Sequence, residues 1–584
     1  MGQSGSQLLP RYNTLQNKLF NARLFNKTII FVLKIMNRKM TKRLLSYILP
    51  FIWLFFLASC KQDKRNITDY PQLSQIKRMG KHEFVINTNE IRSRIRKEIK
   101  TNENLSLIDS VVLSYYEDKN NPFLWIHDFQ EKDNQTDSLL YWLQNSKFQH
   151  GINSQLFPIT DITKNRTLWK ELRITKDNTI NQILAELEYG QTKACLNYAQ
   201  ILNYGLIQPG KILNNLENED LKYGRIPKLP DGSSKKKQLY NIQLKECNKE
   251  FIAQAINKIH EDASSYLREI QPQNRFYNRL QKEYHILDSL KRTGIDSCGN
   301  MTVTECQGKV RLNMERLRWQ PQLEKGDKYV MVNVAAFMLQ AIDHEKDSIL
   351  EMRVCCGSKR NKTPLLASTI NLIELNPYWN VPQSIIRKEI IPAFRRDSSY
   401  FTRNRMKVYD RNGTQLNPHD IKWSKYGENI PFDVRQDNGE GNSLGRIIFR
   451  FPNKFAVYLH DTPSRWAFMR ANRAVSHGCV RVEKALDFGF FLLDKKEDIL
   501  MDRIRVAVDK PAETEEGRKY INKSNYKEMK YHVLEQHIPV FLDYYTMYYS
   551  KNGELSYCED PYQFDAPLLQ VLDSLNTIKN EDTQ

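Results

Sequence analysis

The residues of this chain best suited to chemistry are His460 and the run Ser476–Arg481, which reads Ser-His-Gly-Cys-Val-Arg. Cys479 is a candidate nucleophile, because a thiolate attacks carbonyl carbon readily. A thiol forms a thiolate near neutral pH only when a base or a positive charge lowers its pKa. His460, His477 and the arginine of the run could each do so. An isolated Cys beside a His is usually structural, but this combination predicts a nucleophile site.

Two short segments must position these groups. Alternation over residues 454–460 predicts a half-buried strand that ends at His460. Its two faces would carry Phe455, Val457 and Leu459 on one side and Tyr458 and His460 on the other. A proline three residues later would stop the strand, and Gly478 would allow a tight turn before the thiol. Backbone N–H groups around Gly478 and Cys479 would then face an oxyanion.

These motifs resemble the catalytic domain of the L,D-transpeptidases, whose signature is a His, a spacer and then Ser/Thr-His-Gly-Cys. The resemblance extends to the large branch of that family typified by Gram-negative enzymes that form 3→3 crosslinks in peptidoglycan. The further segments that carry it are 311–319, 376–382, 442–446, 458–463, 538–541 and 560–562. It therefore covers residues from 310 to 570, with several separate motifs in the right order.

The resemblance implies a cysteine acyltransferase with defined roles. Cys479 would be the nucleophile, and His460 the general base and acid, oriented by the backbone of Asp461. His477 would support the loop or act as a second base, and the backbone of Gly478 would contribute to an oxyanion hole. The expected substrate contacts are Arg481, Tyr458, Trp466 and Ser476. An internal salt bridge for Arg481 and core packing for Trp466 are the alternatives.

The implied reaction begins with a thioester between Cys479 and a peptidoglycan tetrapeptide stem, with loss of D-alanine. An amine of a neighbouring stem would then accept the acyl group and form a 3→3 crosslink. The resemblance implies no metal and no organic cofactor, and carbapenems would acylate the same thiol. An L,D-carboxypeptidase or a cysteine endopeptidase, in which water replaces the amine, is an alternative. A non-catalytic wall-binding lipoprotein is another, although intact His460, Gly478 and Cys479 argue against it.

The N-terminal region is typical of a lipoprotein precursor. A basic run at 36–43 precedes an apolar run at 44–57, and Leu57-Ala58-Ser59-Cys60 follows. This predicts a signal peptide over 36–59, cleaved before a lipidated Cys60, with residues 1–35 a spurious upstream extension. An uncleaved transmembrane anchor is the alternative, but the apolar run is short for a membrane span. We therefore expect a lipoprotein of the cell envelope that faces the periplasm, at the outer membrane.

The net charge of +19 is misleading, because residues 1–60 hold nine basic residues and no acidic one. About +10 remains for the rest of the chain, and this moderately basic balance suits an acidic wall polymer. No nucleic-acid-binding motif is present. The nine cysteines show no zinc spacing. Cys298 and Cys306 could form a disulfide in an oxidising compartment, and one of Cys355 and Cys356 should face the core.

The chain divides into predicted regions of different character. Residues 60–87 are a polar tether, and residues 88–305 are a helical scaffold domain without a recognisable peptidoglycan-binding module. Within it, residues 276–290 are expected to form a helix. Residues 306–575 are a mainly-β, sandwich-like catalytic domain, and 576–584 are a tail. Strands are expected at 329–334, 349–354 and 446–450, a helix at 483–493, and a lid of helical and irregular structure at 384–440. The expected fold class is thus α+β, with several domains.

Overall fold

The structure is a computed structural model, and it describes residues 86–101, 104–127, 130–131, 133–171, 173–216, 238–427 and 429–575. The predicted upstream extension, the signal peptide, Cys60, nearly all of the tether and the C-terminal tail lie outside these residues. In the part of the chain that is described, no helix is both long and apolar enough to cross a membrane.

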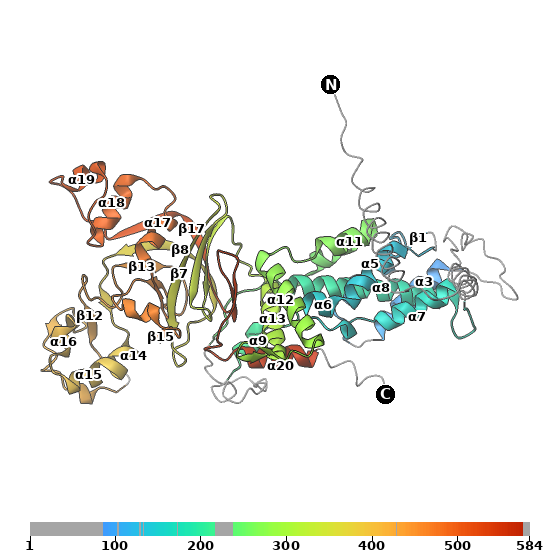
Figure 1. Ribbon diagram of the computed structural model, residues 1–584, viewed down its shortest axis with the longest axis horizontal. Coiled ribbons are helices and arrows are strands. Elements are labelled where there is room, and N and C mark those ends of the chain that lie inside the picture. The colour runs from blue at the N-terminus through green and yellow to red at the C-terminus, as the bar shows by residue number, and fades with distance from the viewer. Residues whose placement is uncertain are drawn as a thin grey trace, which may run out of the picture. The chain divides into compact units, whose positions relative to one another are not determined.

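The described chain begins with helices, as predicted for residues 88–305 (Figure 1). The main ones are α3 (Thr88–Lys100), α4 (Leu107–Glu117), α5 (Asp133–Gln144), α7 (Ile159–Lys170), α8 (Ile180–Tyr204), α11 (Lys249–Glu269), α12 (Arg275–Arg292) and α13 (Val303–Arg318). The helix expected at 276–290 is confirmed as α12. Helix α8 packs against α3, α4, α5, α7 and α11 and forms the centre of the bundle.

Local sequence explains where these helices begin. Asn87, Ser106, Thr179, Asn248, Asn274 and Thr302 cap their first turns by accepting backbone N–H groups. Such caps satisfy donors that the helix leaves unpaired, and each stabilises a helix by about 1 kcal/mol. At Thr302 the cap is reciprocal, because Glu305 accepts from the Thr302 backbone in return. Helix α13 therefore has a sharply defined start.

Helix α13 carries the conspicuous segment 311–319, and its polar residues bind other parts of the chain. Glu315 is fully buried and accepts the backbone N–H groups of Leu206 and Ile207 at 2.6 and 2.8 Å. Arg316 donates to Asp565 at 2.7 Å, and that aspartate starts the last helix, α20 (Asp565–Leu575). The segment thus connects the helical bundle to the C-terminal helix.

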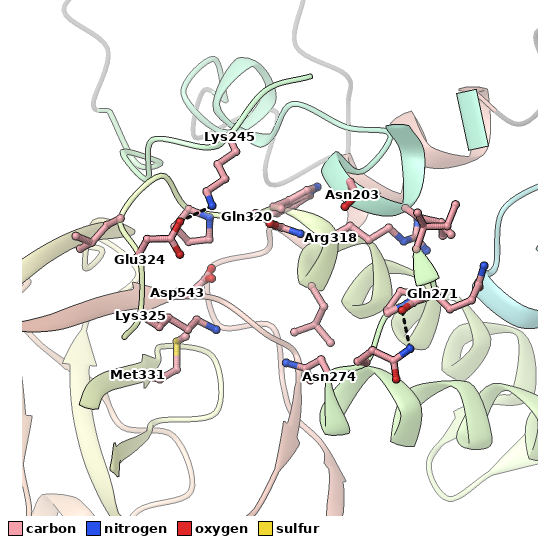
Figure 2. Close-up of a pocket in the computed structure, with 18 of the residues that line it drawn as sticks. Asn203, Lys245, Gln271, Asn274, Arg318, Gln320, Glu324, Lys325, Met331 and Asp543 are labelled. Carbon is pink, nitrogen blue, oxygen red and sulfur yellow. Dashed lines mark hydrogen bonds and ion pairs between the residues drawn. The ribbon is translucent and has the colours of Figure 1, made fainter. Parts of the chain in front are cut away.

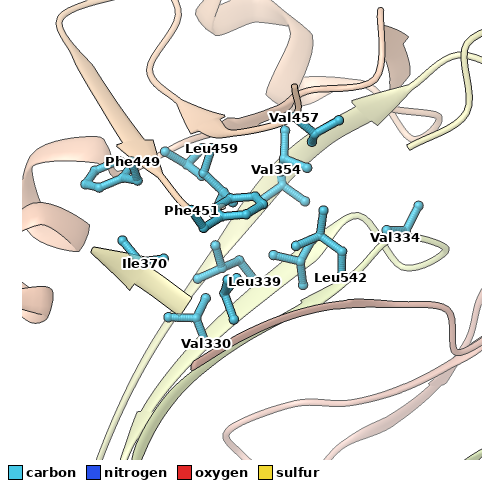
Figure 3. Close-up of a cluster of buried hydrophobic side chains, with 14 of the residues drawn as sticks. Val330, Val334, Leu339, Val354, Ile370, Phe449, Phe451, Val457, Leu459 and Leu542 are labelled. Carbon is cyan, nitrogen blue, oxygen red and sulfur yellow. The ribbon is translucent and has the colours of Figure 1, made fainter. Parts of the chain in front are cut away.

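The second half of the chain is built around one nine-stranded sheet, in the order β15-β7-β16-β14-β13-β8-β17-β5-β6. Its strands are β5 (Lys328–Asn333), β6 (Met338–Asp343), β7 (Ser348–Gly357), β8 (Leu366–Leu375), β13 (Ile447–Arg450), β14 (Leu459–His460), β15 (Ala474–Ser476), β16 (Val480–Val482) and β17 (Tyr531–Asp543). Strand β6 also pairs with β7, so the sheet closes on itself instead of forming the expected sandwich. Aliphatic and aromatic side chains fill its interior (Figure 3).

Most of the predicted elements of this half are present. Strands β5, β7 and β13 confirm the predictions at 329–334, 349–354 and 446–450, and α17 (Ala485–Leu492) confirms the helix. The strand predicted to reach His460 is shorter than expected. It begins only at Leu459, because Ala456 adopts a φ of 53° and Asn453 accepts the backbone N–H of Val457 at 3.1 Å. The chain therefore turns just before the site.

The insertion predicted at 384–440 is a small folded unit. It contains α14 (Gln383–Ile385), a π-helical turn η4 (Ile386–Ile390), α15 (Ile391–Arg396), α16 (Tyr400–Arg403), β10 (Met406–Tyr409), β11 (Gln415–Leu416), η5 (Trp423–Lys425) and β12 (Asp433–Gln436). With β9 (Trp379–Asn380), its strands form a separate four-stranded sheet. It has its own buried cluster, which includes Ile386, Phe401 and Trp423. The prediction of helical and irregular structure missed these strands.

The expectation that one of two adjacent cysteines faces the core is confirmed, and the other is buried as well. Cys355 and Cys356 are both fully buried, because both faces of β7 are covered. Cys356 belongs to the interior of the closed sheet, whereas Cys355 packs against Ala467 and Phe468. Cys298 and Cys306 are free thiols in the structure, so the disulfide considered for them is not present.

Candidate active site

The predicted catalytic residues come together on one face of three neighbouring strands. Strand β14 runs parallel to β16 with His460 opposite Arg481, and β16 runs antiparallel to β7 with Arg481 opposite Cys355. Paired residues in a sheet point to the same face, and residues two apart in a strand share a face. Tyr458 and Cys479, one residue before each strand, therefore join this face; the rings of Tyr458 and His460 lie 5.7 Å apart.

The opposite face of the same strands anchors the site. Leu459, Val480, Val482 and Val354 are buried in the interior of the closed sheet. Figure 3 shows Val354, Val457 and Leu459 in this cluster. Because side chains alternate along a strand, burying these residues fixes the direction in which His460 and Arg481 point. Packing of the core thus sets the register of the site.

His460 is buried and held by its neighbour. Its Nδ1 donates to the backbone carbonyl of Asp461 at 2.5 Å, and only 5% of the residue is exposed. Burial, with the positive charge of Arg481, lowers the pKa of His460 to about 4, and the carbonyls of Asp461 and Leu444 offset this only in part. The imidazole is therefore neutral at pH 7, and its Nε2 is left as the basic nitrogen.

The side chain of Asp461 fixes the carbonyl that orients His460. Its carboxylate accepts the backbone N–H of Arg446 at 2.9 Å and pairs with Arg465 at 3.0 Å. Gly445 makes this approach possible, because its φ is 65° and an added Cβ would lie 2.4 Å from the Asp461 carboxylate. The segment 442–446, noted in the sequence without a role, thus supports the histidine.

Cys479 is a half-buried thiol in its resting form. Its Sγ lies 3.9 Å from the carbonyl of Ala456. Burial raises the pKa of Cys479 above its ordinary value, and hydrogen bonding to Tyr458 and the charges of Arg450 and Arg481 lower it only in part. Burial thus outweighs the charge of Arg481, which was expected to lower this pKa, and His460 does not lower it. The physical reason is that His460 is neutral and carries no charge to stabilise a thiolate.

The loop that carries the thiol is tightly bonded. Ser476 is buried, accepts the N–H of Gly478 at 3.1 Å and donates to the carbonyl of Cys479 at 2.5 Å. Thr363 donates to the carbonyl of Gly478 at 2.8 Å and accepts the N–H of Gly357 at 2.8 Å. Gly478 has a φ of 124°, a conformation that residues with a Cβ rarely adopt. The glycine predicted here is thus required by the backbone.

Two sequence expectations about this loop need correction. The hydroxyl of Ser476 is used inside the loop, so it is not a substrate contact. The N–H of Gly478 is bonded to Ser476, so it does not contribute to an oxyanion hole. The N–H of Cys479 has no bonded acceptor among the described residues. It is therefore the backbone donor available for an oxyanion, which forms when the thiol attacks a carbonyl.

Sequence reasoning missed two residues that brace the loop from behind. The hydroxyl of Tyr562 accepts the N–H of Thr363 at 3.0 Å and donates to the carbonyl of Gly357 at 2.7 Å. Tyr562 is fully buried and stacks on Tyr544. The only signal in the sequence was the segment 560–562, which carried the family resemblance but suggested no contact with the catalytic loop.

Arg481 remains available for an anionic ligand. Its side chain is half-buried, its Nε lacks a hydrogen-bond partner, and it has no ion pair within the described part of the chain. The internal salt bridge considered as an alternative is therefore not present there. Since it lies between His460 and Cys355 across the sheet, a carboxylate bound to it would be held beside the thiol.

His477 and Trp466 lie at the outer side of the site. The Nε2 of His477 contacts the carboxylate of Glu389, which comes from the π-helical turn of the insertion. The insertion thus reaches the nucleophile loop directly. Trp466 is 64% exposed and stacks with Arg470, so core packing is excluded for it. Among the described residues, no group of three or more His, Cys, Asp and Glu side chains could hold a metal ion.

A free thiol and a neutral buried histidine on one face supply the nucleophile and the base that acyl transfer through a thiol uses. Residues 327–497 match the L,D-transpeptidase catalytic domain called YkuD, and residues 110–283 match the Scaffold domain. The "Putative L,D-transpeptidase" of Haemophilus influenzae is 34% identical over 257 residues, which are 44% of this chain and 48% of that protein. The match therefore spans about half the length of that relative.

Two solved structures are also similar over part of their length. One is the Ldtfm–avibactam carbamoyl enzyme, with 13% identity, a TM-score of 0.17, and coverage of 30% of this chain and 48% of that chain. The other is an L,D-transpeptidase from Mycobacterium smegmatis, with 14% identity, a TM-score of 0.16, and coverage of 28% and 53%. The two family models thus identify an L,D-transpeptidase catalytic domain at residues 327–497 and a Scaffold domain at residues 110–283 of this chain.

Proposed function

We propose that this protein is a cysteine L,D-transpeptidase that forms 3→3 crosslinks in peptidoglycan. The observation that carries the proposal is the shared face of β14 and β16, with Cys479 beside Tyr458 and with His460 opposite Arg481. Peptidoglycan is the substrate of the family that the catalytic domain defines. The reaction needs no external energy source, because the amide bond that is cleaved supplies the energy for forming the new amide bond.

The first step forms the thioester. The sulfur of Cys479 bonds to the carbonyl carbon of the third stem residue, and the C–N bond to D-alanine breaks. His460 takes the thiol proton on Nε2 and returns it to the departing amine. The N–H of Cys479 donates to the oxyanion that forms between these events. Arg481 binds a carboxylate of the stem and so holds the scissile carbonyl near the sulfur.

The second step transfers the acyl group. The amine of a neighbouring stem attacks the thioester carbon, the C–S bond breaks, and the sulfur recovers its proton through His460. Water competes with the amine, and the product of that competition is a tripeptide. Exclusion of water therefore decides between a transpeptidase and an L,D-carboxypeptidase. We infer that the insertion provides this exclusion, and the contact of its Glu389 with His477 supports the inference.

The test is incubation of the full protein with a disaccharide–tetrapeptide, followed by mass analysis of the products. A crosslinked dimer with release of D-alanine supports the proposal. Tripeptide alone would establish the carboxypeptidase, and an unchanged substrate would leave a wall-binding protein. The Cys479→Ala variant should lose turnover, and a carbapenem adduct should map to Cys479. Cys558→Ala is the matched control, because burial raises the pKa of Cys558 to about 11 and the residue lies outside the catalytic loop.

The roles of the two histidines are separable by the same assay. His460→Ala should slow acylation by about 100-fold, the usual effect of losing a general base. His477→Ala should have a smaller effect, since its recorded contact is with Glu389 of the insertion. The reverse order would assign the base to His477. Hydrogen exchange across 384–440, with and without a carbapenem adduct, would show whether the insertion becomes ordered when the thiol is acylated.

We also propose that the protein is a lipoprotein of the cell envelope, anchored through Cys60 at the outer membrane and facing the periplasm. The support is the basic run, the apolar run and the segment Leu57–Cys60 in the sequence. Cys60→Ser should release the protein from membranes. Mass spectrometry of the mature protein should find Cys60 as an acylated N-terminus, and recovery of residues 1–35 in it would refute this proposal.

A further inference from the structure

A polar pocket of about 480 Å³ is lined by none of the proposed catalytic residues. Its walls are the end of α8, the turn between α11 and α12, the segment 317–326 after α13, Met331 of β5, and the end of β17 with Tyr545. Figure 2 shows Lys325 and Asp543 on one side of this pocket and Gln271 and Asn274 on the other. Its volume is within the range of sites that hold small organic ligands.

The charges of this pocket are almost all paired. Three ion pairs account for four of the charged residues that line it: Lys245 with Glu324 at 2.5 Å, Arg318 with Glu315 at 2.8 Å, and Glu269 with Lys258. The two that remain are Lys325 and Asp543. Neither forms an ion pair with any described residue, and they form none with each other.

Keeping Lys325 and Asp543 charged in this position costs free energy, because neither has a close ion pair. Lys325 is half-buried, and its ammonium lies 5.3 Å from the ring centre of Tyr329; burial lowers the pKa of Lys325, although the charge of Asp543 raises it in part. Asp543 is only 9% exposed, and burial raises its pKa, although it accepts the N–H of Tyr544 at 2.7 Å, is hydrogen-bonded to Tyr545 and is attracted by the more distant charges of Arg316 and Lys325. A buried charge without a partner is unfavourable, and a ligand of opposite charge relieves that cost. Each group therefore favours a ligand that brings the charge it lacks.

The rest of the lining is neutral and suited to polar contacts. The amide side chains of Asn203, Gln271, Asn274 and Gln320 line the pocket and offer donors and acceptors, and Trp319 and Met331 add apolar surface. No second unpaired lysine or arginine is found in the described lining, so a polyanion such as a phosphate ester is poorly matched. The balance of one cation and one anion instead fits a ligand with one charge of each sign.

We propose that this pocket binds an α-amino acid group, in which an ammonium and a carboxylate share one carbon. The carboxylate lies on Lys325 and the ammonium on Asp543, with the amides around the remainder. Two sources supply this chemistry: a free amino acid, or the free amino acid end of a diamino acid within a wall peptide. The D-alanine released at Cys479 would be one such free amino acid. That assignment rests on the proposed function, whereas the pocket itself does not.

Calorimetry on the full protein tests the site with defined probes. Glycine, D-alanine and 2,6-diaminopimelate carry the complete group, whereas acetate and ethylamine each carry only half of it. The zwitterions should bind, and the half-probes should not. Equal binding of glycine and D-alanine identifies free amino acids as the ligand, and binding of diaminopimelate alone identifies the wall peptide. Cys479→Ala should bind as the wild type does, because Cys479 does not line the pocket.

Variants locate the binding. Lys325→Met should weaken zwitterion binding at least about 10-fold, as expected for the loss of a charged hydrogen bond. Lys245→Met is the matched control, since that lysine lines the same pocket but is paired with Glu324, and it should bind normally. Asp543→Asn keeps an acceptor for the N–H of Tyr544 and should also weaken binding. Thermal unfolding of each unliganded variant verifies that it is folded.

Three outcomes would overturn the proposal. They are binding of acetate as tight as that of glycine, unchanged glycine binding by Lys325→Met, and no binding of any zwitterion at about 10 mM. Glycine binding that depends on Lys325, in a protein that leaves the tetrapeptide substrate unchanged, would instead refute the proposed reaction and retain the pocket. The two proposals therefore fail separately.

Discussion

Raising the pH from 6 to 8 should accelerate alkylation of Cys479 about 100-fold, without a plateau. Burial raises the pKa of the thiol above its ordinary value, so the thiol is protonated throughout this interval. Well below its pKa, the thiolate fraction of any thiol grows about tenfold per pH unit. The reaction with iodoacetamide follows that fraction, because the thiolate is the nucleophile.

His460 supplies the second half of the reasoning. A resting thiolate–imidazolium pair forms only if the pKa of the histidine exceeds that of the thiol. Burial lowers the pKa of His460 to about 4, so the order is reversed and both groups rest in their neutral forms. His460→Ala should therefore change the alkylation rate of Cys479 by no more than about threefold. Acylation by a carbapenem should still fall about 100-fold in this variant, because a base is needed in that step.

The assay is timed alkylation at fixed ionic strength, with the adduct on the Cys479 peptide quantified by mass spectrometry. The Cys558 peptide of the same digest serves as an internal reference, because that thiol also has a raised pKa. A rate that is flat between pH 5 and pH 8 would refute the reasoning, since it would show a thiolate already paired with a charged histidine. A 100-fold loss of alkylation in His460→Ala would refute it as well.

Three substitutions test the framework around the site. Gly478→Ala should lower kcat/KM at least about 10-fold and destabilise the fold by about 1–3 kcal/mol, because a φ of 124° strains any residue with a Cβ; kinetics and denaturant unfolding measure both. Thr363→Val removes the hydroxyl that bridges Gly357 and Gly478 and should cost about 1–3 kcal/mol in unfolding free energy. Gly205→Ala should destabilise by a similar amount with kcat nearly unchanged, since the new Cβ would lie 2.6 Å from the Glu315 carboxylate.

Much of the fold could be predicted because the relevant signals are local. The helices of residues 88–305 follow from apolar residues at helical spacing and from caps such as Asn274 and Thr302. Strands β5, β7 and β13 follow from short apolar runs. The long strand β17 was missed, because its burial comes from pairing with β5 and β8, which are distant in sequence. Closure of the sheet through β6 and β7 depends on the same long-range pairing.

In the candidate site, too, the features set by local sequence could be predicted and those set by long-range contacts could not. The positions of Cys479 and His460 could be predicted because their motif is compact, and the Asp461 carbonyl is adjacent to the histidine by chain connectivity. The support from Thr363 and Tyr562 could not, since those residues are 116 and 83 positions from Cys479 and meet the loop only in the folded chain. The direction of the thiol pKa could not be predicted, for a related reason. It depends on burial, which a local motif does not reveal.

Because Cys479 and His460 both rest in their neutral forms, Arg481 has a role beyond holding the substrate. Its charge contributes, after burial, to the low pKa of His460, and it also lowers the pKa of Cys479. A stem carboxylate bound to Arg481 would cancel much of that charge. The pKa of His460 would then rise. On the proposed function, binding of the correct substrate therefore strengthens the base, while the empty site keeps the thiol protonated and slow to react with other electrophiles.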